Sequence, residues 1–316
     1  MGINMVKSVS LIDIDSKLPN LALMKISAYH KAQGDEVFLN HYDNPDLVYV
    51  SCIFKENASK AYGLQKMFNC PVIIGGPGAY SGPLKDEIEF IMPDYSLYGI
   101  DYAMGYTQRG CIRACPFCIV PKLEGKFREH TWFDTFWNGQ KKMILLDNNF
   151  LASAKWKEKL EWLIDNKIKV SFCQGLDIRL ITRENAELLK QVQYYDLHFN
   201  EKRLYFAFDS LDYEQEVRKG IEILLDVGIS PKNMMFYVLT GFDLPFKDDY
   251  RRYRILWEEL GVYPFIMLYN NGGSLLQRKF ARYVNKRIHK VVPFYEYDRL
   301  TKEEKEIVTN IIKSDR

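Results

Sequence analysis

The sequence has no stretch of about 18 uncharged apolar residues, the length that a membrane-spanning helix requires. Its opening segment, MGINMVKSVSLIDIDS, carries acids within its apolar run and has no signal-peptide cleavage pattern. Net charge is also nearly absent, because 43 basic and 41 acidic side chains leave only +2, so the overall field favours no particular partner. We therefore expect a cytoplasmic protein, in a reducing compartment, with no membrane partner.

Cysteine is scarce, with six residues in 316, yet three of the six lie within a single short segment. Disulfides are not expected in a reducing compartment, so a tight group of cysteines indicates metal binding. Cys52 and Cys70 are expected to be small core residues, and Cys173 to end a strand. Aromatic residues, in contrast, are plentiful at 14%, including 21 tyrosines, which suggests broad packed surfaces or a stacking pocket.

Strand-like and helix-like stretches alternate through the first hundred residues. The apolar runs lie at residues 9–14, 37–39, 47–53 and 72–74, and the helix-like stretches at residues 18–33 and 58–68. This alternation predicts a small parallel, Rossmann-like α/β domain over residues 1–100. Its last strand leads into the segment GGPG at residues 75–78, which fits a plain turn as well as a ligand-binding loop and does not match the dinucleotide fingerprint.

A second series of strands and helices begins at residue 102. Strands are predicted at residues 102–106, 143–146, 169–173, 204–208, 234–239 and 265–269, and helices at residues 155–164, 185–193, 213–227 and 250–260. Six βα units on this spacing fit a partial (β/α)6 TIM-like barrel over residues 101–270. Such barrels carry their chemistry at the carboxyl ends of the strands, where the cysteine group follows the first strand.

Residues 271–316 form a C-terminal tail with a predicted basic helix at residues 276–291. The basic side chains of this helix, with aromatics between them, would suit nucleic acid. The alternative, which we favour because the net charge is so small, is an amphipathic helix that closes the barrel while its charges face solvent.

The cysteine group consists of Cys111, Cys115 and Cys118. Thiolates are soft ligands that suit iron–sulfur clusters and zinc, and three of them on a four-iron cube would leave one iron open to a cofactor. With Phe117, these residues spell Cys-x3-Cys-x-aromatic-Cys, which resembles the signature of the radical S-adenosylmethionine (radical SAM) superfamily. The resemblance implies an enzyme that binds a [4Fe–4S] cluster and cleaves S-adenosylmethionine to a 5′-deoxyadenosyl radical, which abstracts hydrogen from an unidentified substrate. It also implies an external electron donor such as flavodoxin or ferredoxin.

The same resemblance implies which residues contact S-adenosylmethionine. They are Phe117 beside the cofactor, Asn148 near the methionine amino group, Arg179 near its carboxylate, Gln174 and Asp209 near the ribose, and Leu239 beside the adenine. No catalytic residue beyond the cluster ligands is assigned. Candidates for the substrate cavity, each of which fits a structural role equally well, are Tyr237, Asp243, Tyr269 and Asn270.

In arrangement, residues 1–100 resemble the cobalamin-binding type of domain found in one branch of this superfamily. The base-off cobalamin signature, Asp-x-His-x-x-Gly, is not matched, since Asp15 stands where the histidine ligand would be and Leu18 where the glycine would be. This departure disfavours cobalamin, and we favour a retained fold that shapes the substrate pocket.

Three alternatives stay open. One is a zinc site in which Cys111, Cys115 and Cys118 join His130 in a Cys3His tetrahedron. The second is a cobalamin-dependent or tRNA-directed methyl or methylthio transferase of the same superfamily, although the first domain has no second cysteine triplet. The third is a non-catalytic iron–sulfur or zinc protein that serves electron transfer or binding.

Overall fold

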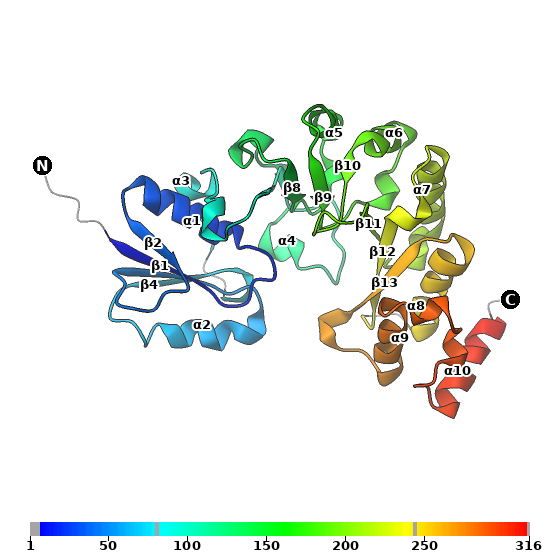
Figure 1. Cartoon of the computed structure of the whole chain (residues 1–316). Coiled ribbons are helices and arrows are strands. Elements are labelled where there is room, and N and C mark those ends of the chain that lie inside the picture. The colour runs from blue at the N-terminus through cyan, green and yellow to red at the C-terminus, as the bar shows by residue number, and fades with distance from the viewer. Residues whose placement is uncertain (1–6, 80–81, 243–244, 315–316) are drawn as a thin grey trace, which may run out of the picture. The chain divides into compact units, whose positions relative to one another are not determined.

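The computed structural model describes residues 7–79, 82–242 and 245–314 (Figure 1). The chain forms two compact units. The first unit comprises Met1–Thr107 and His130–Met143, and the second comprises Gln108–Glu129 and Ile144–Arg316. Both units contain parallel strands joined through helices, which confirms the α/β class. The domain limits drawn from the sequence at residues 100 and 270 stay a prediction.

A four-stranded parallel sheet with the order β2-β1-β3-β4 organises the first unit. Its strands are β1 (Ser8–Asp13), β2 (Glu36–Leu39), β3 (Leu47–Ser51) and β4 (Val72–Gly75). Helix α1 (Leu21–Ala32) begins at the cap residue Asn20 and shares an apolar cluster on one face with α3 (Asp86–Glu89), while α2 (Ala58–Leu64) packs on the other face (Figure 1). Because helices cover both faces, the central strands β1 and β3 are buried along most of their length, as is typical of parallel sheets.

Two sheets of parallel strands form the frame of the second unit. In one of them β8 (Lys142–Leu145), at which the chain enters this unit, is followed in order by β9 (Lys169–Phe172) and β10 (Gln193–Tyr194). The other has the order β11 (Leu204–Ala207), β12 (Met234–Thr240), β13 (Tyr263–Leu268). The loop after β9 joins the two, since the Leu176 N–H donates to the Tyr205 carbonyl at 2.7 Å. The six strands expected from residue 102 onward all form, the first of them as β5 (Ala103–Gly105).

Four helices connect consecutive strands of the second unit: α5 (Trp156–Asp165), α6 (Arg183–Gln191), α7 (Glu214–Asp226) and α8 (Phe246–Arg254), the last with a π-helical continuation at Ile255–Glu259. The short helix α4 (Val120–Leu123) comes earlier in the chain, and α9 (Leu275–Asn285) and α10 (Lys302–Ser314) follow the last strand. Figure 1 shows α5, α6 and α7 in a row along one side of the strands. None of the helices in the described part of the chain is long and apolar enough to cross a membrane.

Strand β12 shows how this packing divides the side chains between two faces. Met234, Phe236 and Val238 are fully buried, whereas Met235 and Tyr237 between them stay partly exposed. The alternation follows from the period of two along a strand. One face of the sheet therefore packs in the core, and the other is left open.

The basic tail helix is shorter than the sequence predicts. It ends at Asn285, because Arg287 adopts a left-handed φ of +61° that an α-helix cannot contain, and a short 3-10 turn follows at Ile288–Lys290. Its Lys279 pairs with Glu304 of α10 at 2.7 Å. The favoured interpretation, a helix that closes the barrel, and the alternative of nucleic-acid binding both stay predictions.

Candidate metal centre

The three cysteines lie in one loop of the second unit, residues 110–127, which we call the cysteine loop. It is closed at its base by an antiparallel pair, β6 (Gln108–Arg109) with β7 (Arg128–Glu129). Gly110 opens the loop with φ +71°, and Cys111 forms a bridge with Lys126. A Cβ on Gly110 would lie 2.4 Å from the Lys126 carbonyl oxygen, so only glycine fits where the two ends of the loop cross.

Glu124 holds the start of the cysteine loop and links the loop to the segment that follows β8. Its Oε2 accepts hydrogen bonds from the Gly110 N–H at 2.8 Å and from Asn148 Nδ2 at 2.7 Å. Asn148, expected near the methionine amino group, lies in the segment that follows β8. The structure therefore brings it to the loop, with its amide engaged by Glu124.

Two N–H donors are directed at one of the thiols, that of Cys111. All three cysteines are free and half-buried. The Arg113 N–H donates to Cys111 Sγ at 3.3 Å, Asn149 Nδ2 lies 3.8 Å from the same sulfur, and a turn joins the Cys118 N–H to the Cys115 carbonyl at 3.0 Å. Burial raises the pKa of Cys115, and the acidic neighbours Cys118, Asp209 and Cys111 raise it further, while Arg179 lowers it. Cys115 thus lies within electrostatic reach of the other two cysteines.

Asp177 is the hub that connects the cysteine loop to the end of β9. Its carboxylate accepts hydrogen bonds from Arg113 Nε at 2.9 Å, Arg179 Nε at 2.7 Å and Asn149 Nδ2 at 3.3 Å, and only 6% of the side chain is exposed. Burial alone would raise the pKa of Asp177, but the hydrogen bonds and charges of Arg179 and Arg113 outweigh burial and hold the pKa below its usual value. The carboxylate therefore stays ionised between two arginines.

A chain of contacts extends from Arg179 to the ends of β11 and β12. The Arg179 guanidinium lies 4.5 Å from the ring centroid of Tyr213. The Tyr213 hydroxyl accepts a hydrogen bond from the Asp209 N–H at 2.6 Å, and Asp209 Oδ1 accepts one from the Leu239 N–H at 3.0 Å. Burial raises the pKa of Asp209, against the lowering effects of the Leu239 hydrogen bond and of Arg252 and Arg179. Three residues expected at the cofactor thus belong to one connected network.

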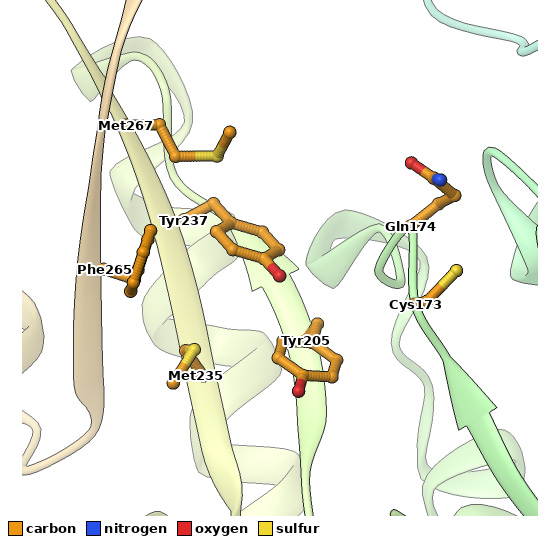
Figure 2. A pocket seen from close by; sticks show the side chains of 7 residues that line it. All are labelled: Cys173, Gln174, Tyr205, Met235, Tyr237, Phe265 and Met267. Carbon is orange, nitrogen blue, oxygen red and sulfur yellow. The ribbon is translucent and has the colours of Figure 1, made fainter. Parts of the chain in front are cut away.

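The remaining two predicted cofactor residues lie outside that network of contacts. Phe117 packs edge-on against Phe242, with 5.7 Å between the ring centroids. Gln174 is exposed and, together with Cys173, borders a cavity of about 590 Å³ (Figure 2). Of the residues named as cavity candidates, Tyr237 lines this cavity, and Asp243 is outside the described residues.

The donors fit an iron–sulfur cluster in kind, although the side chains are not gathered as ligands. Three half-buried thiols share one anchored loop, with N–H donors directed at sulfur. Within the described residues, no three side chains of histidine, cysteine, aspartate or glutamate lie close enough together to hold a metal ion. Cluster binding would therefore need the thiols to turn toward one another. His130, the fourth ligand of the zinc alternative, belongs to the first unit, where its Nε2 lies 2.9 Å from Glu89 Oε1.

The residues of the first unit do not fit a cobalamin ligand. Asp15 lies between the carboxyl ends of β1 and β3, where the strand order reverses and open α/β sheets bind ligands. Its carboxylate is fully engaged there, accepting hydrogen bonds from Ile53 N–H, Phe54 N–H and Asn57 Nδ2 at 2.7, 3.1 and 2.8 Å. The glycines after β4 are explained by packing as well, because a Cβ on Gly76 would lie 2.4 Å from the Cys52 carbonyl oxygen.

Comparison with known proteins gave no match, either among protein-family models or among curated proteins. The case for a function therefore depends on the residues themselves. Sequence reasoning missed the residues that hold the cysteine loop in place: Arg113, Glu124, Asn149, Asp177 and Tyr213. Arg113 lies inside the cysteine motif, and Asp177 lies two residues before Arg179. The opposite charges of Asp177 and these two arginines were the only signal in the sequence that could have indicated the ion pairs.

Proposed function

We propose that this protein is a radical SAM enzyme, in which Cys111, Cys115 and Cys118 hold a [4Fe–4S] cluster and S-adenosylmethionine is cleaved reductively. The observation that carries the proposal is the Asp177 network, which fastens a loop with three free thiols to the strand ends that the resemblance assigns to the cofactor. We further propose that the first unit is Rossmann-like and that the strands from residue 102 onward form a partial (β/α)6 barrel.

The residues around the loop can divide the work of binding. When bound, the cluster would supply the electron that breaks the S–C5′ bond of S-adenosylmethionine. In this proposal Arg179, held by Asp177 and Tyr213, pairs with the methionine carboxylate, as an arginine fixed by two neighbours can do with little loss of side-chain entropy. Asn148 first holds the loop through Glu124, and reaching the methionine amino group would require that bond to open.

Asp209 and Leu239 have a structural part in this proposal. The Asp209 carboxylate fixes the end of β12 by accepting a hydrogen bond from the Leu239 N–H. Arg252, buried among these strands, donates to the carbonyls of Phe208 and Leu239, both at 2.8 Å. The ends of β11 and β12 are therefore fixed before any cofactor binds.

Product analysis tests the proposal. The protein, reconstituted with iron and sulfide without oxygen, is incubated with S-adenosylmethionine and dithionite, with Cys115→Ala as the matched control. We expect 5′-deoxyadenosine from the parent protein and none from the variant. Formation of S-adenosylhomocysteine instead would indicate methyl transfer. The absence of both products would support a non-catalytic binding protein. We also expect 5′-deoxyadenosine to form when reduced flavodoxin or ferredoxin supplies the electron in place of dithionite.

A further inference from the structure

We infer that the cavity bordered by the loop after β9 and by β11, β12 and β13 is the substrate pocket, and that it takes an uncharged molecule carrying an aromatic ring system. The assignment of this ligand as a substrate rests on the proposed function, whereas its chemical class rests on the cavity alone. The cavity measures about 590 Å³, which suits a ligand of drug-like size. It is lined by Cys173, Gln174, Tyr205, Met235, Tyr237, Phe265 and Met267.

Aromatic rings form one wall of the cavity. Tyr205 and Tyr237, on neighbouring parallel strands, stack with 5.7 Å between the centroids and 6° between the planes. Phe265 meets Tyr237 edge-on at 5.9 Å. Figure 2 shows the Tyr237 ring directed from its strand toward the side where Cys173 and Gln174 lie. Flat ligands gain from stacked or edge-on contact with such rings beyond the burial of apolar area.

The open face of this sheet is not needed to complete the core. The residues that alternate with the cavity wall on β12 and β13, such as Phe236, Val238 and Ile266, are at most 2% exposed and already fill the interior. Met267, on the cavity side, is 45% exposed. Methionine side chains adapt to irregular partners and are common at binding surfaces. The arrangement is thus a formed apolar surface that a ligand could cover.

None of the described residues that line the cavity carries a charged side chain. Burial raises the pKa of Cys173 to about 12, with the nearby Asp147 charge adding to the effect, and burial likewise raises the pKa of Tyr237 to about 12, so both are neutral at physiological pH. An ionic ligand would lose its hydration without gaining a partner of opposite charge. The Gln174 amide and the tyrosine hydroxyls offer neutral hydrogen bonds instead.

The position of the cavity relates it to the proposed cofactor site. Cys173 and Gln174 belong to the same loop after β9 that carries Asp177 and Arg179. Leu239, whose N–H binds Asp209, lies on β12 beyond Tyr237 on the same face. A molecule in the cavity would therefore lie along the strands whose ends hold the network around the cysteine loop.

The test uses the full chain without cofactors and four probes of equal ring size. These are 2-naphthalenemethanol, 2-naphthoate, (2-naphthylmethyl)trimethylammonium and decahydro-2-naphthalenemethanol. Binding is followed through the 13C-methyl resonances of methionine, with Met235→Leu and Met267→Leu assigning two of the ten methionines. We expect 2-naphthalenemethanol to shift these two resonances, both ions to bind roughly tenfold more weakly, and the saturated alcohol to bind several-fold more weakly.

Two tyrosine variants make the test specific. Tyr237→Leu should weaken 2-naphthalenemethanol binding by about tenfold, whereas Tyr263→Leu, on β13 but outside the cavity wall, should leave it unchanged. Naphthoate or the ammonium probe binding as tightly as the alcohol, or no probe shifting either methionine, would overturn the inference. Because no cofactor is present, failure here is distinct from failure to form 5′-deoxyadenosine.

Discussion

Asp177 is the residue on which the candidate site depends most. It holds Arg113 of the cysteine loop and Arg179 at the strand end with one buried carboxylate. Removing that charge leaves two arginines facing each other without a counterion, which destabilises the loop more than the loss of a surface pair would.

We predict that Asp177→Asn lowers the free energy of unfolding by about 1–3 kcal/mol, the usual cost of losing hydrogen bonds to charged groups. Because folding lowers the pKa of Asp177 from 3.8, its contribution is full above that pH and is lost as the pH falls through the folded value. Urea unfolding at pH 7 and pH 3 measures both effects. Asp165→Asn, an exposed aspartate on α5, is the control and should change neither. Equal stabilities for the parent and Asp177→Asn at pH 7 would contradict the prediction.

His289 gives a second prediction at this scale. It lies among the rings of Tyr253, Trp257 and Tyr283, and burial lowers its pKa from 6.5 to about 4, with Lys290 and Arg287 adding to the lowering. The unfolded chain therefore binds a proton that the folded chain rejects, so stability should fall as the pH drops from 6.5 to 4.

Between pH 6.5 and pH 4, His289 should lower the free energy of unfolding by an amount on the order of 2–3 kcal/mol. His289→Phe keeps a ring in the cluster and should remove that part of the pH dependence, while His198→Gln, at an exposed site, should keep it. Chemical denaturation across this pH range measures the difference. Parallel curves for the parent and His289→Phe would show that the histidine does not titrate in this way.

At the scale of elements, the cysteine loop depends on the close approach of its two ends at Gly110 and Lys126. Substitutions at two glycines of the loop test this dependence. Gly110 and Gly125 have nearly equal φ values of +71° and +75°, but a Cβ on Gly110 meets the Lys126 carbonyl at 2.4 Å and one on Gly125 meets nothing within 4 Å. Both alanine variants carry the same backbone strain of about 1–2 kcal/mol. Only the first also forces the ends of the loop apart.

We therefore predict that Gly110→Ala loses most of the iron bound after anaerobic reconstitution, while Gly125→Ala retains it. Iron per chain and urea unfolding are measured on both variants, so that a loss of iron can be separated from a loss of fold. If both variants bind iron equally, the loop crossing does not shape the site.

The elements themselves were largely predictable, because apolar runs and helical spacing are local properties. The strand at residues 169–173 and the helix at residues 213–227 form as β9 and α7 within one residue at each end. The errors occur where a single residue decides the boundary. With Asn20 as its cap, α1 begins at Leu21, three residues later than expected. The left-handed conformation of Arg287 ends the basic tail helix earlier than expected. The pair β6 and β7 was missed because two-residue strands carry no periodic signal.

The candidate site was predictable in part, for a related reason. The spacing of the three cysteines can be recognised within one short segment of the sequence. The Asp177 network, in contrast, joins residues as far apart as 64 positions, as the hydrogen bond between Arg113 and Asp177 shows. Charge pairs of this kind depend on tertiary contacts that no single segment specifies. The same holds for the aromatic cavity, where alternate residues of three strands meet only after the sheet has formed.

For the whole molecule, two units with parallel sheets are combined with one loop of thiols. In the first unit the ligand position of the sheet is filled by the Asp15 carboxylate and its hydrogen bonds. In the second, the cysteine loop, the Asp177 network and the aromatic cavity belong to one compact unit. We therefore propose no cobalamin step and place the chemistry in the second unit.

The central claim is that the cysteine loop holds a four-iron cluster with one iron open to S-adenosylmethionine. The most direct measurement is electron paramagnetic resonance of the reconstituted, dithionite-reduced protein, with and without S-adenosylmethionine. We predict a reduced-cluster signal that changes shape when S-adenosylmethionine is added and is absent from Cys115→Ala. A signal that does not respond to S-adenosylmethionine, or stoichiometric zinc with no signal, would contradict the claim.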